Sequence, residues 1–399
     1  MFADPVSYAL FAVYGLAAVI LLASRFNVVA PAVFSYVVVL TVALIRYAQL
    51  GLGAPDAIYY DQIAAALARG ETSAAISAGK EGLSQTLAVV YAALGHDPVL
   101  GLWLNAIASA LMVGLVGGIA SRLDMPVSTA SWIAALYPAF IVWGTLLLRE
   151  AMVWLWLALL LYAVAGIVKG AGRTSWNVAL LLLAFIMLLA FRGSIGIAVL
   201  VASLAAIVLS RRRGRKNEWI TYLAVIAVLF AAYATPLSGQ IDRIFDRYTF
   251  ERLELSREAL QRTGDTGFAT GSGAPFLVAI TVLPRVLAGP YVWEIGTVGV
   301  PGVLESTLWL VLLLLAFRGW RRLTERRSAN VLVVPALVLI YVLAMTSGNY
   351  GTMIRLRTQV ALMLIPLAAA GLARTKKSLG ARGLGLRSRG LSEASSGIR

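Results

Sequence analysis

The feature that most constrains this sequence is its series of long apolar runs. Several approach the roughly 20 residues that an α-helix needs to cross the hydrocarbon core of a bilayer, for example residues 98–120 and 151–168. The chain is 60% hydrophobic, and its mean hydropathy is +0.83, more than a soluble domain can cover with polar side chains. Because the runs are continuous rather than alternating, they predict an all-α, polytopic transmembrane bundle and not an outer-membrane barrel.

We expect about eleven membrane crossings, counted from the apolar runs and from the charged residues that end them. Two long polar stretches interrupt the series, at 47–96 and 236–300, and amphipathic helices are expected in these outer loops. Within the second stretch, an apolar segment at 275–300 is broken by prolines and glycines, so we expect it to be re-entrant or interfacial. The expected crossings are residues 6–24, 28–46, 98–120, 127–147, 151–168, 176–191, 194–210, 218–235, 301–317, 330–346 and 359–373.

The basic residues predict the orientation. A formal net charge of +15 would suggest nucleic acid as the partner of a soluble protein. Here the basic residues lie mostly in short loops, so topology explains them better, and we expect no nucleic-acid partner. Placing the basic run 211–216 in the cytoplasm puts the N-terminus outside and the C-terminus inside. Residues 1–373 then form one transmembrane domain, and the basic tail 374–399, rich in Gly and Ser, is expected to be disordered and cytoplasmic.

A polar stretch between the second and third crossings, residues 56–70, is predicted to form a short helix along the bilayer surface. Its helical spacing places Ile63 and the alanines on one side and Asp61 elsewhere. Asp56 and Asp61, on either side of Tyr59 and Tyr60, are the candidate catalytic residues, since an acid there meets a lipid head group. An ordinary amphipathic loop helix is the alternative.

Arginines gather on the same outer side. Arg149-Glu150 lies between two apolar runs, and Arg192 stands nearly alone in a tight turn. Ionisable residues at such positions are costly unless paired or hydrated. Together with Arg355 and Arg357, they predict a cationic pocket for a lipid phosphate or pyrophosphate, because guanidinium groups bind phosphate oxygens in pairs. Interfacial anchoring or a structural ion pair is the alternative. The other candidate substrate-binding residues on this side are Tyr59, Tyr60, Lys80, Glu81 and Asn349.

Other chemistries find little support. The chain has no cysteine and one histidine, which excludes thiol chemistry and a multi-histidine metal centre. The charges of residues 242–262 alternate in sign at helical spacing, as in a solvated helix. The glycine-rich stretch 264–273 follows no strand and contains no P-loop, so no nucleotide is expected. We expect no cofactor, and a divalent metal is not indicated.

Four segments resemble known membrane enzymes. The Asp56-(x)2-Tyr-Tyr-(x)3-Ala-(x)2-Leu-(x)2-Gly70 pattern resembles the first outer loop of GT-C-fold glycosyltransferases of the family-39 type, which carry their catalytic Asp there. The Pro138…Leu148-Arg-Glu150 stretch, Gly289-Pro-Tyr-Val-Trp-Glu294 and Gly348–Arg357 resemble segments of bacterial exopolysaccharide and O-antigen assembly proteins.

The resemblance implies an enzyme of the bacterial inner membrane that uses a polyprenyl-phosphate-linked sugar and a glycan or lipid acceptor. A carboxylate would hold or deprotonate the acceptor hydroxyl, and cationic groups would stabilise the departing phosphate. A polysaccharide polymerase that uses polyprenyl-pyrophosphate oligosaccharide is the second possibility. A lipid-linked oligosaccharide flippase is the third, although a transporter should line a central path with polar residues.

Overall fold

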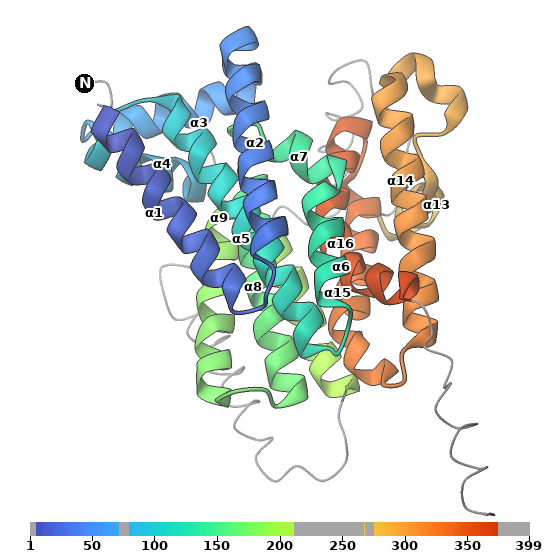
Figure 1. Ribbon diagram of the computed structural model, residues 1–399. Coiled ribbons are helices and arrows are strands. Elements are labelled where there is room, and N and C mark those ends of the chain that lie inside the picture. Colours follow the sequence, from blue (N-terminus) through green and yellow to red (C-terminus); the bar gives the residue numbers. More distant parts are fainter. Residues whose placement is uncertain (1–4, 72–79, 211–266, 268–274, 374–399) are drawn as a thin grey trace, which may run out of the picture.

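The computed structural model is a bundle of helices (Figure 1), which confirms the predicted all-α, polytopic class. Eight of its described helices are long and apolar enough to cross a membrane, and α6 and α7 together make a ninth, bent candidate. The predicted crossing at 218–235 and the tail 374–399 lie outside the described residues, so the expected total of eleven stays a prediction. The structure describes residues 5–71, 80–210, 267 and 275–373.

The described helices follow the predicted apolar runs closely. Asp97 begins α5 as a helix cap, because its carboxylate accepts a hydrogen bond from the Val99 backbone N–H at 2.8 Å. In chain order the helices are α1 (Pro5–Ser24), α2 (Val29–Leu50), α3 (Pro55–Ala68), α4 (Glu81–Leu94), α5 (Pro98–Arg122), α6 (Val127–Leu136), α7 (Pro138–Gly144), α8 (Glu150–Lys169), α9 (Thr174–Leu209), α13 (Pro275–Ala288), the 3-10 turn η1 (Val292–Glu294), α14 (Ile295–Arg322), α15 (Arg326–Thr346) and α16 (Tyr350–Leu372).

One end of the bundle is tied together by ion pairs. The Lys169 ammonium at the end of α8 lies 2.5 Å from Asp124 Oδ2 and 3.0 Å from Glu325 Oε2. Asp124 follows α5 and Glu325 precedes α15, so three loops meet here. We call this the loop end of the bundle, and it corresponds to the predicted cytoplasmic side.

The helix α9 reverses direction at Arg192, whose backbone (φ −161°, ψ 74°) is not helical. A Cβ at Gly196 would lie 3.1 Å from Leu188 Cβ, whereas eight residues of a continuous helix rise about 12 Å. Ser210 donates a hydrogen bond to the Arg327 carbonyl at the loop end. The two halves of α9 therefore run antiparallel, as the predicted pair of crossings around Arg192 requires.

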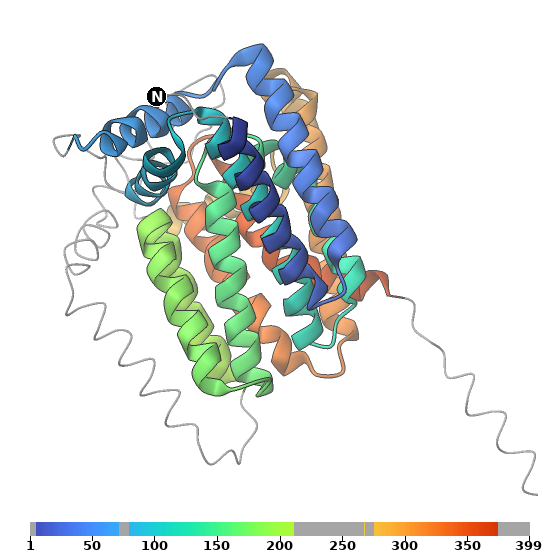
Figure 2. The same cartoon turned by 60° about the vertical axis from the view of Figure 1, so that its left-hand side comes forward.

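The opposite end is covered by α3 and α4, which lie across the bundle rather than along it (Figures 1 and 2). The predicted surface helix in residues 56–70 is thus confirmed as a helix. Its buried face differs from the prediction, because Asp61 is only 8% exposed and lies with Tyr60, Ala64 and Ala65. We call this the covered end, and the charged side chains described below gather here.

The segment between α7 and α8 is irregular although it is buried. Backbone carbonyls inside a bilayer need hydrogen-bond donors. The side chain of Asn105, fully buried on α5, donates to the carbonyls of Leu146 at 2.6 Å and Leu148 at 3.0 Å. This contact fixes the backbone immediately before Arg149 and Glu150.

The predicted broken segment at 275–300 contains α13, η1 and the start of α14. The 14 residues of α13 are too few to cross a bilayer, and α13 packs against α15. Gly299, at a φ of 69°, breaks the helix before Pro301, and the long part of α14 follows. The segment is thus broken where its glycines and prolines lie, and its interfacial or re-entrant position stays a prediction.

Candidate functional site

Six charged side chains meet at the covered end, and we call them the charged site. They come from five parts of the chain that lie far apart in the sequence, and all six were predicted as candidate residues. They are Asp56 on α3, Lys80 before α4, Arg149 and Glu150 at the start of α8, Arg192 in the turn of α9, and Arg355 on α16.

Asp56 is held by two cations. The Lys80 ammonium donates a hydrogen bond to Asp56 Oδ1 at 2.7 Å, and Arg355 Nη1 lies 3.8 Å from Oδ2. Burial raises the pKa of the Asp56 carboxyl, but the hydrogen bond from Lys80 and the nearby positive charges outweigh burial, so the pKa lies below its usual value. Asp56 is therefore ionised at neutral pH, and 44% of its side chain is exposed.

Glu150 is the buried counterpart of Asp56. Its side chain is 1% exposed; Arg192 Nη1 donates to its Oε1 at 3.3 Å, and Arg355 Nε forms an ion pair with the same oxygen at 3.2 Å. The first turn of α8 favours a negative charge because backbone N–H groups point toward it. The second oxygen, Oε2, is buried and accepts no hydrogen bond from the residues that the structure describes.

Lys80 is positioned by close packing. A Cβ at Gly82, near the start of α4, would lie 2.6 Å from the carbonyl oxygen of Ala190. Only glycine allows α4 to approach α9 this closely. The Lys80 ammonium also lies 4.4 Å from the ring centroid of Tyr59 and 5.7 Å from that of Tyr60, within the range of cation–π attraction.

Tyr60 is 2% exposed, and Arg149, Glu150 and Asp56 all act on it electrostatically. Burial is the largest effect and raises the pKa of Tyr60 to about 12, so its hydroxyl is a neutral hydrogen-bond donor beside the charges. Arg149 donates to the Phe191 carbonyl at 3.3 Å, which joins α8 to the turn of α9.

The charged site has an excess of positive charge. Within the described residues it contains four cations, from Lys80 and three arginines, against the carboxylates of Asp56 and Glu150. Two positive charges are therefore in excess. Such a cluster attracts an anion with several oxygens, and its arginines can bind phosphate oxygens in pairs.

Asp61 does not belong to the charged site. The Tyr91 hydroxyl on α4 donates to Asp61 Oδ1 at 2.8 Å, and His96 Nε2 lies 3.1 Å from the same oxygen. Burial, followed by the charge of Asp61, raises the pKa of Tyr91. These contacts join α3, α4 and the residues just before α5, so the role of Asp61 is to hold these segments together. The sequence left open whether Asp56 or Asp61 is the better candidate for the base. Only Asp56 lies in the charged site, which favours Asp56.

Three other candidates are not among the six. Arg357, predicted to share the pocket of Arg355, is fully buried and faces Glu305, because residues two apart on a helix point to different sides. Asn349 caps α16 by accepting a hydrogen bond from the Thr352 N–H at 3.2 Å. Glu81 begins α4 next to Lys80.

Glu305 was not among the predicted site residues, although it lies in the apolar run 301–317. The sequence could have identified it, because a single acid inside a predicted crossing is energetically costly and therefore a candidate functional residue. In the described part of the chain, no three His, Asp or Glu side chains lie together as a metal site would need.

Comparison of the chain with protein-family models, with curated sequences and with solved structures gives no match.

Proposed function

We propose that this protein is a membrane glycosyltransferase. It would transfer a sugar from a polyprenyl-phosphate donor to a glycan or lipid acceptor at the outer face of a bacterial inner membrane. The observation that supports this most strongly is the position of Asp56, an exposed carboxylate beside an excess of cations at one end of a membrane bundle.

The cations have a clear role in this reaction. As the bond between sugar and phosphate breaks, negative charge develops on the phosphate oxygens. Lys80 and Arg355 stand next to Asp56 and can stabilise that charge. Arg192 and Arg149 add to the positive potential, and Glu150 holds two of the arginines in place.

Asp56 is the proposed base. In the absence of substrate, Lys80 and Arg355 lower its basicity. When a donor phosphate draws these cations toward its own oxygens, the carboxylate regains basicity and can accept the proton of the acceptor hydroxyl. Substrate binding would thus prepare the base at the site where the leaving group is stabilised.

A polysaccharide polymerase is the second candidate, and one observation favours it. Four cations around two carboxylates suit the greater charge of a pyrophosphate. In that reaction, Asp56 would act as a structural partner of Lys80 rather than as the base.

The test is sugar transfer in proteoliposomes that contain the full-length protein. One set receives a polyprenyl-phosphate sugar, and the other receives a polyprenyl-pyrophosphate oligosaccharide. Transfer from the monophosphate supports the glycosyltransferase, whereas chain lengthening from the pyrophosphate supports the polymerase. If neither donor supports activity, although a thermal melting transition shows that the protein is folded, both proposed reactions are refuted.

A further inference from the structure

Tyr60 lies on the same face of α3 as Asp56, one helical turn further along the chain. Asp56 is at the exposed edge of the charged site, with 44% of its side chain exposed, whereas Tyr60 is 2% exposed. The charges of Arg149, Arg192 and Glu150 act on the Tyr60 hydroxyl, as does that of Asp56. The tyrosine therefore extends from the exposed carboxylate toward the buried charges of the site.

The Tyr60 hydroxyl makes no hydrogen bond to any residue that the structure describes. Two other tyrosines at the covered end are paired. The Tyr91 hydroxyl donates to Asp61 Oδ1 at 2.8 Å, and the Tyr8 hydroxyl donates to Asp97 Oδ2. A hydroxyl that leaves water without gaining a partner costs free energy. The folded chain carries this cost at Tyr60, beside the charges that attract an anion.

The position of the Tyr60 hydroxyl lets a ligand reach it. Its oxygen retains accessible surface, because it is not one of the fully buried polar atoms that lack a partner in the described structure. Around it, the side chains of Lys80 and Arg355 are 27% and 19% exposed, and that of Asp56 is 44% exposed. A ligand that enters beside Asp56 thus meets two cations and this hydroxyl.

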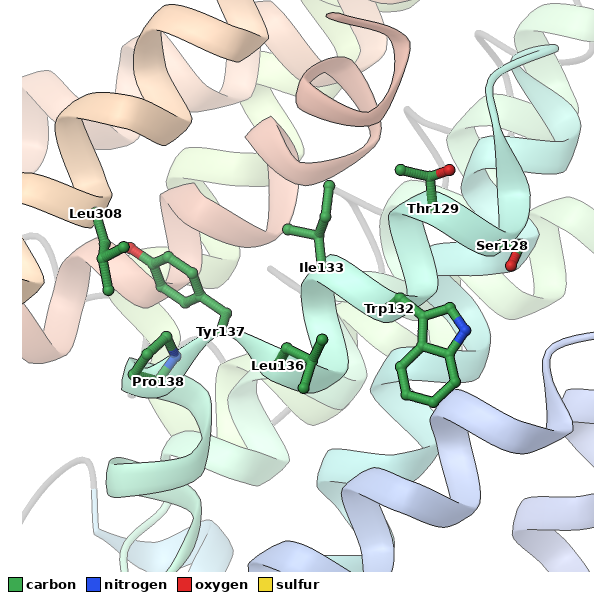
Figure 3. Close-up of a pocket in the computed structure, with 8 residues that line it drawn as sticks. All are labelled: Ser128, Thr129, Trp132, Ile133, Leu136, Tyr137, Pro138 and Leu308. Atoms are coloured by element: carbon green, nitrogen blue, oxygen red, sulfur yellow. The ribbon is translucent and has the colours of Figure 1, made fainter. Parts of the chain in front are cut away.

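Tyr137 is the contrasting case. Its hydroxyl is fully buried and lacks a partner among the described residues. Figure 3 shows its ring in the wall of a pocket of about 480 Å³ between α6–α7 and α14, with the hydroxyl directed toward Leu308. None of the described side chains that line this pocket is charged, so it offers an anion no attraction. Only at Tyr60 do these two tyrosines combine an accessible hydroxyl with nearby cations.

A phosphate group fits the surroundings of Tyr60. Burial raises the pKa of Tyr60 to about 12, so the hydroxyl keeps its proton at neutral pH and can donate it in a hydrogen bond. Such a bond is stronger when the acceptor oxygen is charged. A phosphate has several charged oxygens, so one can accept from Tyr60 while others face Lys80 and Arg355.

We propose that Tyr60 is a phosphate-binding residue, whose hydroxyl donates a hydrogen bond to an oxygen of a phosphate group held at the charged site. The inference rests on the proposed function, because it needs a phosphate at that site. It adds a neutral donor to the cations that stabilise the leaving group. A lipid head group and inorganic phosphate share this chemistry, and the experiment separates them.

The test measures the binding of farnesyl phosphate, a short polyprenyl phosphate, to the full-length protein in lipid nanodiscs by calorimetry, with empty nanodiscs as the blank. Inorganic phosphate is titrated in parallel. Tyr60→Phe removes only the hydroxyl, so binding should weaken about fivefold, the effect of one lost hydrogen bond. A similar loss with both probes supports recognition of the phosphate group itself, and a loss with farnesyl phosphate alone supports recognition of a lipid head group.

Thermal unfolding separates a binding role from a structural one. The Tyr60 hydroxyl has no partner to lose within the described structure, so Tyr60→Phe should unfold at the same temperature as the unchanged protein or at a higher one. Tyr91→Phe is the matched control, because the Tyr91 hydroxyl donates to Asp61 on the same helix α3. It should unfold at a lower temperature and bind farnesyl phosphate within about twofold of the unchanged protein.

Two results with Tyr60→Phe would overturn the inference and leave the proposed transfer reaction standing. One is unchanged binding of farnesyl phosphate and of inorganic phosphate. The other is a fall in unfolding temperature as large as that of Tyr91→Phe, which would give the hydroxyl a structural partner. If the unchanged protein binds neither probe, the inference is also overturned, and sugar transfer in proteoliposomes decides the proposed function separately.

Discussion

Arg355 Nη1 on α16 lies 3.8 Å from Asp56 Oδ2 on α3, and Arg355 Nε lies 3.2 Å from Glu150 Oε1 on α8. One arginine thus links the exposed carboxylate of the charged site to the buried one. The two halves of the chain meet at this guanidinium, which makes Arg355 the most informative cation to remove.

Arg355→Ala should reduce sugar transfer by about 100-fold, the usual effect of removing a group that stabilises developing charge. Arg355→Lys should restore only part of the activity, because an ammonium cannot reach both carboxylates in the fork geometry of arginine. The measurement is the initial transfer rate in proteoliposomes. Arg318→Ala, an exposed cation at the other end of the bundle, is the control. Equal rates for Arg318→Ala and Arg355→Ala would contradict the assignment.

Gly82→Ala should lower transfer by moving Lys80 away from Asp56, since the added methyl group would meet the Ala190 backbone at 2.6 Å. The expected loss of transfer rate is at least tenfold, because Lys80 would still be present but displaced from its position beside Asp56. Gly296→Ala is the matched control, because a Cβ there has no neighbour within 4 Å. A rate unchanged by Gly82→Ala would show that the α4 contact does not position Lys80.

Asn105→Leu should destabilise the folded protein by about 1–3 kcal/mol, because the Leu146 and Leu148 carbonyls would lose their donor inside the membrane. The measurement is the thermal unfolding midpoint in detergent. Ser203→Ala should have a smaller effect, since the buried Ser203 hydroxyl has no hydrogen-bond partner in the described structure. Equal shifts in the two variants would argue against a structural role for Asn105.

The pH profile should reflect the ionisation of Asp56. A lowered pKa means that the carboxylate stays ionised until the pH falls below its usual value of about 4, so Asp56 should cause no loss of transfer between pH 5 and 8. The stability that its ionisation provides is present above pH 4 and is lost as the pH falls further. Lys80→Met removes the hydrogen bond that lowers the pKa of Asp56 against the effect of burial. The acidic side of the pH–rate profile of this variant should therefore move to higher pH. Superimposable profiles would contradict this account.

The sequence predicted the arrangement of the crossings because each apolar run ends at a residue that water must solvate. The reversal at Arg192 was predictable, since an arginine beside Gly193 is a poor fit to a continuous apolar helix. The six charged residues share one end of the bundle, and the positive-inside rule predicts that this end faces outward.

Three features could not be predicted in the same way. Asp61 is not on the apolar stripe of its helix, and only the tertiary approach of Tyr91 and His96 makes its burial tolerable. The separation of Arg355 from Arg357 depends on where α16 begins, because that sets which side each residue faces. The ion pair between the buried Arg357 on α16 and Glu305 on α14 became visible only through the contact between these two helices.

The most direct test compares Asp56→Asn with Asp61→Asn in transfer from a polyprenyl-phosphate sugar. Both substitutions keep the side-chain shape and remove one charge. We expect Asp56→Asn to abolish transfer in folded protein, while Asp61→Asn lowers thermal stability and leaves the transfer rate within a few-fold of the unchanged protein. Full transfer by Asp56→Asn, or a loss confined to Asp61→Asn, would show that Asp56 is not the base.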